Sequence, residues 1–254
     1  MQMTQQDIYA PSFVSHLFDE MARTYGVVNL ISSFGFAKRW RRQCLRSIEV
    51  KHGSTVLDLM TGMGELCHDL VDSIGPNGSL YAVDISPVMC NRARQQVKPR
   101  DAHFQVIEAN ALNCPFNDET IDAVVSTFGL KTFDNDQLRL LAREVARVLR
   151  PGGQFAFLEI SVPPNWILRL PYMFYLTWII PLIGRLALGN PENYRLLGIY
   201  TQAFGNCDTI ADLFTSAGLR VSRHSYFFGC ATGVSGLKPH PEPAHSSFGL
   251  KVRQ

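Results

Sequence analysis

The stretch STVLDLMTGMGE at residues 54–65 is followed by SLYAVDIS at residues 79–86. Each stretch is rich in β-branched and aliphatic residues, which predicts a short buried strand. The first strand runs into a Gly-x-Gly turn, and the second ends at Asp84, twenty residues after Gly64. Parallel strands end at one edge of a sheet, where open α/β folds bind their ligands, so the two stretches predict a cofactor site of the Rossmann type.

The rest of the chain repeats this alternation of strand and helix. Helices are expected within residues 5–50, over residues 66–74, from Ser86-Pro87 onward, and over a segment around residues 138–149 that stops at Pro151. Further strands are expected at residues 103–108, 121–127 and 154–160. Strands that alternate with amphipathic helices predict an α/β fold with a mainly parallel, Rossmann-like sheet flanked by helices.

The pattern shows no repeat and no interdomain linker, so we expect a single domain over residues 1–254. The expected parts are an N-terminal helical lid (1–50), a cofactor-binding core (51–162), a hydrophobic helical insertion over the acceptor site (163–205), and the last part of the sheet with a tail (206–254).

Composition limits the partners. The 24 basic and 22 acidic residues give a net charge of +2, which argues against nucleic acid as the main partner. The six cysteines are scattered singly and are expected to be reduced thiols, with neither disulfides nor a metal site. Residues 1–7 lack the pattern of a signal peptide, which predicts a cytoplasmic protein. The apolar stretch 170–183, interrupted by Pro171 and Pro181, is expected to be too short and too broken to span a membrane.

The acidic and glycine residues at the strand ends point to a particular cofactor. Asp84 suits a ribose diol, whose two hydroxyls a carboxylate can accept together. A nicotinamide dinucleotide is the alternative, but its fingerprint requires a third glycine where Cys67 stands, and Glu65 would repel a pyrophosphate. A carboxylate tolerates a sulfonium with an ammonium group, so S-adenosylmethionine is the expected cofactor. Asn110-Ala111, after the third strand, is a candidate for the adenine edge.

Nearly the whole chain resembles the ubiquinone/menaquinone biosynthesis C-methyltransferases. The specific motifs are Phe18-Asp19-Glu20-Met21-Ala22 with Tyr25 and Asn29, Trp40-Arg41-Arg42, the glycine loop, Asp84-Ile85-Ser86 with Met89, Phe128-Gly129-Leu130, and Pro151-Gly152-Gly153. The resemblance implies that Asp58, Gly62 and Gly64 hold the methionine end of the cofactor. It also implies that Asp84 and Ile85 bind the ribose, that Met89, Asn110 and Ala111 lie near the adenine, and that Tyr25 lies on a segment closing over the donor. Thr127, at the end of the fourth strand, is assigned to the same cofactor set.

This chain departs from the family pattern near the expected acceptor pocket. Gly129-Leu130-Lys131-Thr132 replaces the usual Gly-Leu-Arg-Asn, and the tail from Pro239 to Gln254 is longer than usual. Arginine and lysine are not interchangeable, so we expect the donor site to be kept and the acceptor to differ. Lys131 and a tyrosine, either Tyr25 or Tyr200, are the candidates for positioning or polarising the acceptor.

The acceptor is expected to be a hydrophobic, electron-rich aromatic such as a prenylated quinol, methylated on carbon. The alternatives are methyl transfer to oxygen or nitrogen of a natural product, or a methyltransferase-like protein repurposed for cyclisation or assembly. The aromatic-rich segment 166–188 suits a wall of the acceptor pocket, and its alternatives are a peripheral membrane surface or a homodimer interface.

Overall fold

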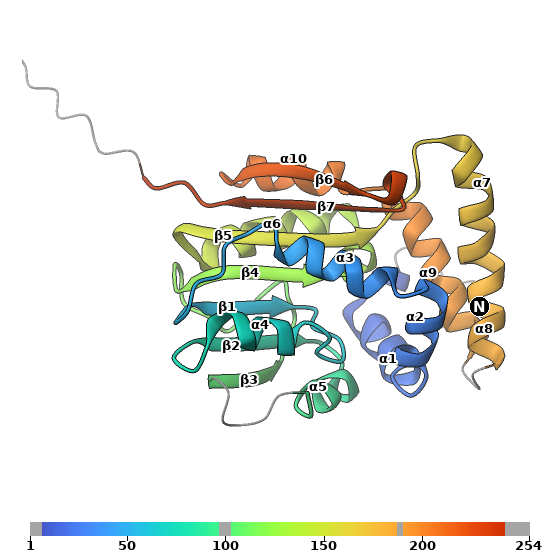
Figure 1. Ribbon diagram of the computed structural model, residues 1–254, viewed down its shortest axis with the longest axis horizontal. Helices are drawn as coiled ribbons and strands as arrows, with labels where there is room; N and C mark the ends of the chain where they lie inside the picture. The colour runs from blue at the N-terminus through green and yellow to red at the C-terminus, as the bar shows by residue number, and fades with distance from the viewer. Residues whose placement is uncertain (1–6, 97–102, 187–189, 242–254) are drawn as a thin grey trace, which may run out of the picture.

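The computed structural model describes residues 7–96, 103–186 and 190–241. Its centre is a seven-stranded sheet in the order β3-β2-β1-β4-β5-β7-β6 (Figure 1). The strands are β1 (Thr55–Leu59), β2 (Ser79–Asp84), β3 (His103–Glu108), β4 (Ile121–Thr127), β5 (Leu149–Ile160), β6 (Arg220–Tyr226) and β7 (Ala231–Leu237). The pairs from β3 through β5 are parallel, whereas β7 runs antiparallel to both β5 and β6. The predicted Rossmann-like α/β fold is therefore confirmed.

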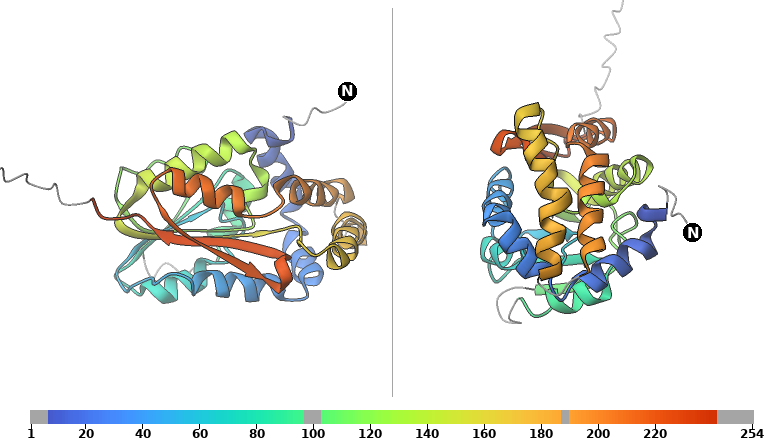
Figure 2. Two further views of the ribbon diagram at one scale, coloured as in Figure 1. Left: turned by 90° about the horizontal axis from the view of Figure 1, so that it is seen from above. Right: turned by 90° about the vertical axis from the view of Figure 1, so that its right-hand side faces the viewer.

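Helices cover both faces of the sheet and one of its ends (Figure 2). They are α1 (Pro11–Met21), α2 (Tyr25–Ser33), α3 (Phe36–Leu45), α4 (Cys67–Ile74), α5 (Pro87–Ala93), α6 (Asn135–Val148), α7 (Trp166–Phe174), α8 (Ile180–Leu186), α9 (Pro191–Phe204) and α10 (Asp208–Ser216). Short helical turns occur at Asp7–Tyr9, Leu130–Thr132 (η2) and Phe227–Gly229 (η4), and a π-helical segment, Tyr175–Ile179, joins α7 to α8.

Two apolar layers hold these helices on the sheet. Helices α6 and α10 bury Leu141, Val145 and Phe214 on one face, and α3 and α4 bury Trp40 and Leu70 on the other. A third cluster joins the N-terminal helices to α9. Helix α6 begins at a capping box in which the Asp134 carboxylate accepts from the Gln137 backbone N–H, which fixes its first turn at the carboxyl edge of the sheet.

Most predicted elements agree with the structure, and two differ. Strand β5 begins at Leu149, five residues before the predicted start, because the Pro-Gly-Gly stretch forms an irregularity within the strand and not a loop before it. Helix α6 ends at Val148 as its pattern predicts. The expectations for residues 1–6 and for the tail beyond residue 241 lie outside the described residues.

The expectation for the apolar stretch 170–183 was wrong. Helical structure continues unbroken from Trp166 to Leu186, through both prolines. Its 21 residues have a mean hydropathy of 1.4, which makes it long and apolar enough to cross a membrane, and 11% of the most apolar window is buried. A proline removes one backbone donor, but the helix survives here because the other donors still bond along it. The elements within 1–50 and 163–205 are helical, while their division into lid and insertion stays a prediction.

Gly64 shows why the glycine loop needs its second glycine. Its φ is +81°, and an added Cβ would lie 3.1 Å from the Cα of Ala93 on α5. Both the left-handed backbone and the close approach of α5 therefore require glycine at this position. Gly53 has nearly the same φ, +82°, but nothing lies within 4 Å of an added Cβ.

We expect Gly64→Ala to lower the free energy of unfolding by about 2–4 kcal/mol, because it combines left-handed strain with overpacking. Gly53→Ala carries the strain alone and should cost about 1–2 kcal/mol. Urea unfolding of both variants measures the difference. Equal losses for the two variants would show that α5 does not constrain Gly64.

Candidate active site

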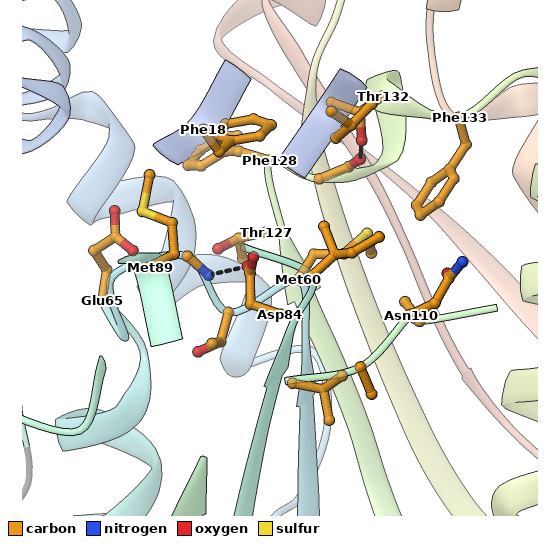
Figure 3. A pocket seen from close by; sticks show the side chains of 18 of the residues that line it. Phe18, Met60, Glu65, Asp84, Met89, Asn110, Thr127, Phe128, Thr132 and Phe133 are labelled. Carbon is orange, nitrogen blue, oxygen red and sulfur yellow. Dashed lines mark hydrogen bonds between the residues drawn. The ribbon is translucent and has the colours of Figure 1, made fainter. Parts of the chain in front are cut away.

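A cavity of about 770 Å³ opens at the carboxyl edge of β1, β2 and β4, beneath the N-terminal helices. This volume lies within the range of small-molecule sites, about 300–1,000 Å³. Seven of the predicted residues line it: Gly62, Asp84, Ile85, Met89, Asn110, Ala111 and Thr127. Figure 3 shows the Asp84 carboxylate between Glu65 on one side and Asn110 on the other. The cavity is therefore elongated across the strand ends, with an acid at its middle.

Asp84 is fixed by two backbone donors. The Gly62 N–H donates to one carboxylate oxygen (2.8 Å) and the Ser86 N–H to the other (2.9 Å). The residue is buried, yet its side chain lines the cavity. Burial raises the pKa of Asp84 to about 6, and these two hydrogen bonds oppose the rise. Each oxygen keeps a further lone pair, so the carboxylate can accept two hydroxyl donors from a ligand.

Two residues predicted to hold the methionine end lie behind the cavity wall. The Asp58 carboxylate accepts from the Thr61 hydroxyl (2.6 Å), and it is Thr61 that lines the cavity. Gly64 packs against α5 instead of facing the cavity. Burial raises the pKa of Asp58 to about 7, and the Thr61 hydroxyl lowers it. Asp58 and Gly64 thus shape the loop from behind, while direct contact with a cofactor stays a prediction.

Arg41 is a site residue that the sequence analysis missed. Its guanidinium donates to the Glu65 carboxylate (3.1 Å) and to the Thr127 hydroxyl (3.3 Å), and lies 4.9 Å from the centre of the Phe128 ring. Its basic neighbours on α3, Lys38 and Arg42, are exposed, but Arg41 is buried and lines the cavity. The signal was present, because Arg41 lies at helical spacing from Ala37 and Cys44 on the buried face of α3.

The N-terminal helices are tied down over the cavity by polar contacts. On α1, the Asp19 carboxylate accepts from the Ser86 hydroxyl (2.6 Å), and the Ser15 hydroxyl donates to the Ile85 carbonyl (3.2 Å). The Asn193 amide on α9 donates to Glu20 (2.7 Å). These contacts join α1 both to the end of β2 and to α9, so the N-terminal helices form the roof of the cavity.

A second cavity, of about 610 Å³, adjoins the first. Tyr25 and Phe128 line both cavities, so they form the partition between them. The second cavity is otherwise mostly apolar, with Leu176 and Ile180 from the segment Trp166–Leu186 and Leu197 from α9 in its wall. Its cationic side chain is Lys131, on the turn η2.

Lys131 forms a buried ion pair at the base of the second cavity. Its ammonium donates to the Glu159 carboxylate (2.8 Å) and to the Phe128 carbonyl (3.0 Å). Glu159 is fully buried and also accepts from the backbone N–H groups of Lys131 and Ile160. An ammonium has three donors, so two are held by the protein and one remains for a ligand in the cavity.

The two candidate tyrosines occupy different environments. Tyr25 lies at the junction of the two cavities, and burial, followed by the charge of Glu65, raises the pKa of its hydroxyl far above the ordinary value. It therefore stays protonated at neutral pH and can donate a hydrogen bond. Tyr200 is fully buried, lines neither cavity, and donates to the Ile8 carbonyl. The structure uses Tyr200 to attach the N-terminus, and its catalytic role stays an unsupported prediction.

All six cysteines are free and buried. Burial raises the pKa of every one of these thiols, to about 11 for Cys90 and Cys230 and to about 12 for Cys44 and Cys114. Among residues 7–96, 103–186 and 190–241, no cluster of three His, Cys, Asp or Glu side chains could hold a metal ion.

The fold and the cavity at the strand ends are those of a class I methyltransferase. A SAM-dependent methyltransferase from Aquifex aeolicus is similar in structure, with a TM-score of 0.55, 21% identity, and coverage of 78% of this chain and 88% of that one. The cyclase SpnF is also similar, with a TM-score of 0.61, 12% identity, and coverage of 91% and 97%. At these identities the likeness shows the fold alone.

The sequence comparison is more specific. The model of the ubiE/COQ5 methyltransferase family matches residues 2–238, and the chain belongs to that family. The demethylmenaquinone methyltransferase of Geobacillus sp. (strain WCH70) is 34% identical over 227 residues, which cover 89% of this chain and 96% of the relative. The counterpart from Bacillus cytotoxicus is 32% identical over 231 residues, with coverage of 90% and 97%. The predicted family and the methyltransferase class are confirmed.

The raised pKa of Asp58 predicts an unusual pH dependence of stability. Between the unfolded value of 3.8 and the folded value of about 7, the native state binds more protons than the unfolded state. Asp58 therefore makes the free energy of unfolding fall as the pH rises. Asp58→Asn removes this effect, so we expect the variant to gain about 2 kcal/mol relative to the parent protein between about pH 5.5 and pH 8.

Urea unfolding at both pH values measures this gain. Asp72→Asn, at an exposed acid on α4, is the matched control and should leave the pH dependence of the parent protein nearly unchanged. A stability difference between Asp58→Asn and the parent that does not vary with pH would contradict the expectation.

Proposed function

We propose that this chain transfers a methyl group from S-adenosylmethionine to a ring carbon of a hydrophobic quinol. The observation that carries the proposal is the pair of adjoining cavities. One holds a fixed carboxylate between polar ends, and the other is apolar with a buried ammonium at its base. Since Tyr25 and Phe128 alone separate them in the lining, a donor in the first cavity and an acceptor in the second can meet at these two side chains.

The residues of the first cavity fit S-adenosylmethionine. Asp84 would accept from the two ribose hydroxyls, and Asn110 with Ala111 would lie beside the adenine. Arg41 and Glu65 carry opposite charges and would hold the carboxylate and ammonium of the methionine end. A pyrophosphate would instead meet Glu65 with like charge. S-adenosylmethionine, when bound, supplies a methyl group on positively charged sulfur.

The chain's own residues contribute alignment and exclusion of water. The roof formed by α1 and α2, with Phe18 and Tyr25 in the lining, keeps water from the reacting groups. The partition at Tyr25 and Phe128 limits the direction from which an acceptor approaches. Alignment of two reactants in this way supplies a large part of the acceleration in a displacement reaction.

The second cavity would make the acceptor nucleophilic. A quinol hydroxyl beside the free donor of Lys131 loses its proton more readily, because the ammonium stabilises the resulting phenolate. The phenolate raises electron density on the ring carbons ortho and para to it. The ring carbon then gains the methyl group and loses its own proton. Tyr25 would donate a hydrogen bond across the partition, since its hydroxyl stays protonated.

The class of acceptor is proposed from the relatives, which are named for demethylmenaquinone. Lysine at position 131, where the family pattern has arginine, supports an acceptor that differs in its polar groups from theirs. Methyl transfer to oxygen or nitrogen would be recognised by the position of the methyl group in the product. The cytoplasmic location, the homodimer and the exclusion of nucleic acid stay predictions.

Binding of the donor tests the first cavity. Asp84→Asn removes the charge that accepts both ribose hydroxyls, so we expect S-adenosylmethionine to bind about 10- to 100-fold more weakly. Isothermal titration calorimetry measures this loss, with NAD as a second ligand that should not bind. Asp118→Asn, at the opposite edge of the sheet, controls for the loss of an acid. Unchanged donor affinity in Asp84→Asn, or tighter binding of NAD, would overturn the assignment.

Turnover tests the second cavity. Removing Lys131 alone would leave Glu159 buried without its partner, so the test variant is Lys131→Met with Glu159→Gln. We expect kcat/KM for a quinol acceptor to fall by about 100-fold with donor affinity unchanged, because the phenolate loses its stabilising charge. The optimum should also move to higher pH, since the quinol must then ionise unaided.

The matched control is Lys238→Met. The Lys238 ammonium also pairs with a glutamate and with backbone carbonyls, but at the far edge of the sheet. A folded double variant with normal turnover and an unmoved pH profile would show that Lys131 is structural only. Mass spectrometry and NMR of the product identify the atom that carries the new methyl group.

A further inference from the structure

One end of the molecule carries an exposed apolar stripe. It runs along the helical segment Trp166–Leu186, at the right in Figure 1 and facing the viewer in the right panel of Figure 2. Its exposed side chains are Trp166, Leu170, Phe174, Trp178, Leu182 and Leu186. A monomeric soluble protein rarely exposes a continuous apolar patch of this kind without a partner.

The stripe stays on one side because the helix is not regular. Positions four apart in an α-helix drift by roughly 40°, so a stripe from Leu170 to Leu182 would turn by about 120°. The π-helical segment Tyr175–Ile179 has wider turns and offsets part of this drift. π-Helical segments are rare and occur mainly at functional sites. The exposed stripe is thus a feature that the backbone itself supports.

The opposite side of the same helical segment faces the second cavity. Leu176 and Ile180 line that cavity, and Gly184 packs against Tyr194 of α9. The segment is therefore a wall one helix thick between the proposed acceptor site and the outside.

Three phenylalanines beside the stripe have strained backbones. Phe34, Phe227 and Phe228 have φ values of 49°, 44° and 55°, a region in which a bulky residue costs roughly 1–2 kcal/mol. Phe34 is 77% exposed and Phe228 78% exposed. The Phe34 ring lies 6.1 Å from that of Tyr175, and Phe227 lies 4.9 Å from Phe36. Strain held at exposed aromatic side chains indicates that these side chains serve a function outside the fold.

The charges around the stripe are basic. Within Trp166–Leu186 the charged residues are Arg169 and Arg185, both exposed, and Lys38, Arg39 and Arg42 are exposed on the neighbouring α3. A second copy of this face, related by a two-fold axis, would set like charges together. Anionic lipid headgroups would instead complement them, at about 1 kcal/mol for each basic residue near the surface.

We infer that the apolar stripe, with Phe34, Phe227 and Phe228, seats this protein on a bilayer that contains anionic lipid. The helix lies in the plane of the interface, since its inner side forms the wall of the second cavity and would lose those contacts in a spanning orientation. The aromatic side chains enter the acyl boundary, and the arginines contact the headgroups. An acceptor with a long apolar chain can then pass from the bilayer to the cavity behind the helix, a step that rests on the proposed function.

Vesicle co-sedimentation of the full chain tests the surface. Phosphatidylcholine vesicles with and without phosphatidylserine are the probes. We expect binding to vesicles that contain phosphatidylserine, reduced by added salt, and reduced at least tenfold in the triple variant Trp166→Ser, Leu170→Ser, Trp178→Ser. Leu140→Ser, at an exposed leucine of α6, is the control and should bind as the parent protein does. Binding that is equal in the triple variant and the parent would overturn the inference.

Two other occupants give different results. A dimer in sedimentation velocity that the triple variant dissociates, without vesicle binding, would assign the stripe to a second copy of the chain. Parent protein that resists alkaline carbonate extraction from vesicles would indicate a spanning helix. Donor affinity is measured in parallel: an intact donor site with no vesicle binding refutes the membrane surface alone, whereas vesicle binding without donor affinity refutes the proposed function alone.

The last readout links the surface to turnover. In the triple variant, kcat/KM should fall at least tenfold for a prenylated quinol embedded in vesicles but stay unchanged for a short-chain quinol in solution. Equal loss with both acceptors would mean that the substitutions damage the cavity wall and would contradict a docking role.

Discussion

The site depends on the contact between two loops that meet at Asp84. Parallel pairing of β1 with β2 places Leu59 beside Val83, so the glycine turn and the acid end at the same edge. The Gly62 and Ser86 N–H groups then hold the carboxylate from two sides. Ser86 also caps α5 and donates to Asp19 on the roof. One buried carboxylate thus orients the glycine loop, the start of α5 and, through Ser86, the helix that covers the cavity.

The sequence was sufficient for the sheet and for most of the cofactor cavity, because both follow from local patterns. Strand ends and a Gly-x-Gly turn can be located from hydropathy and spacing. The roles of Asp58 and Gly64 could not, since a residue in the right loop can face either the ligand or the protein behind it. Arg41 was missed because a basic run suggests an exposed helix face, and only its position relative to Ala37 and Cys44 indicates burial.

The acceptor side was harder to predict because its residues come from distant parts of the chain. Tyr25, Lys131 and Leu176 line one cavity although more than forty residues separate each from the next. Tyr200 seemed equivalent to Tyr25 in the sequence, but tertiary packing directs its hydroxyl to the Ile8 carbonyl. The helix from Trp166 to Leu186 was judged broken because its prolines were weighed alone, without the hydrogen bonds that continue around them.

The burial of all six thiols gains a meaning from the proposed chemistry. A quinol in air oxidises to a quinone, which is an electrophile that adds to thiolates and so arylates cysteine. Thiolate is the reactive form, and burial raises the pKa of each cysteine here well above neutral pH. A protein that handles redox-active rings in this way offers them little nucleophilic sulfur, and so resists inactivation by the oxidised form of its own substrate.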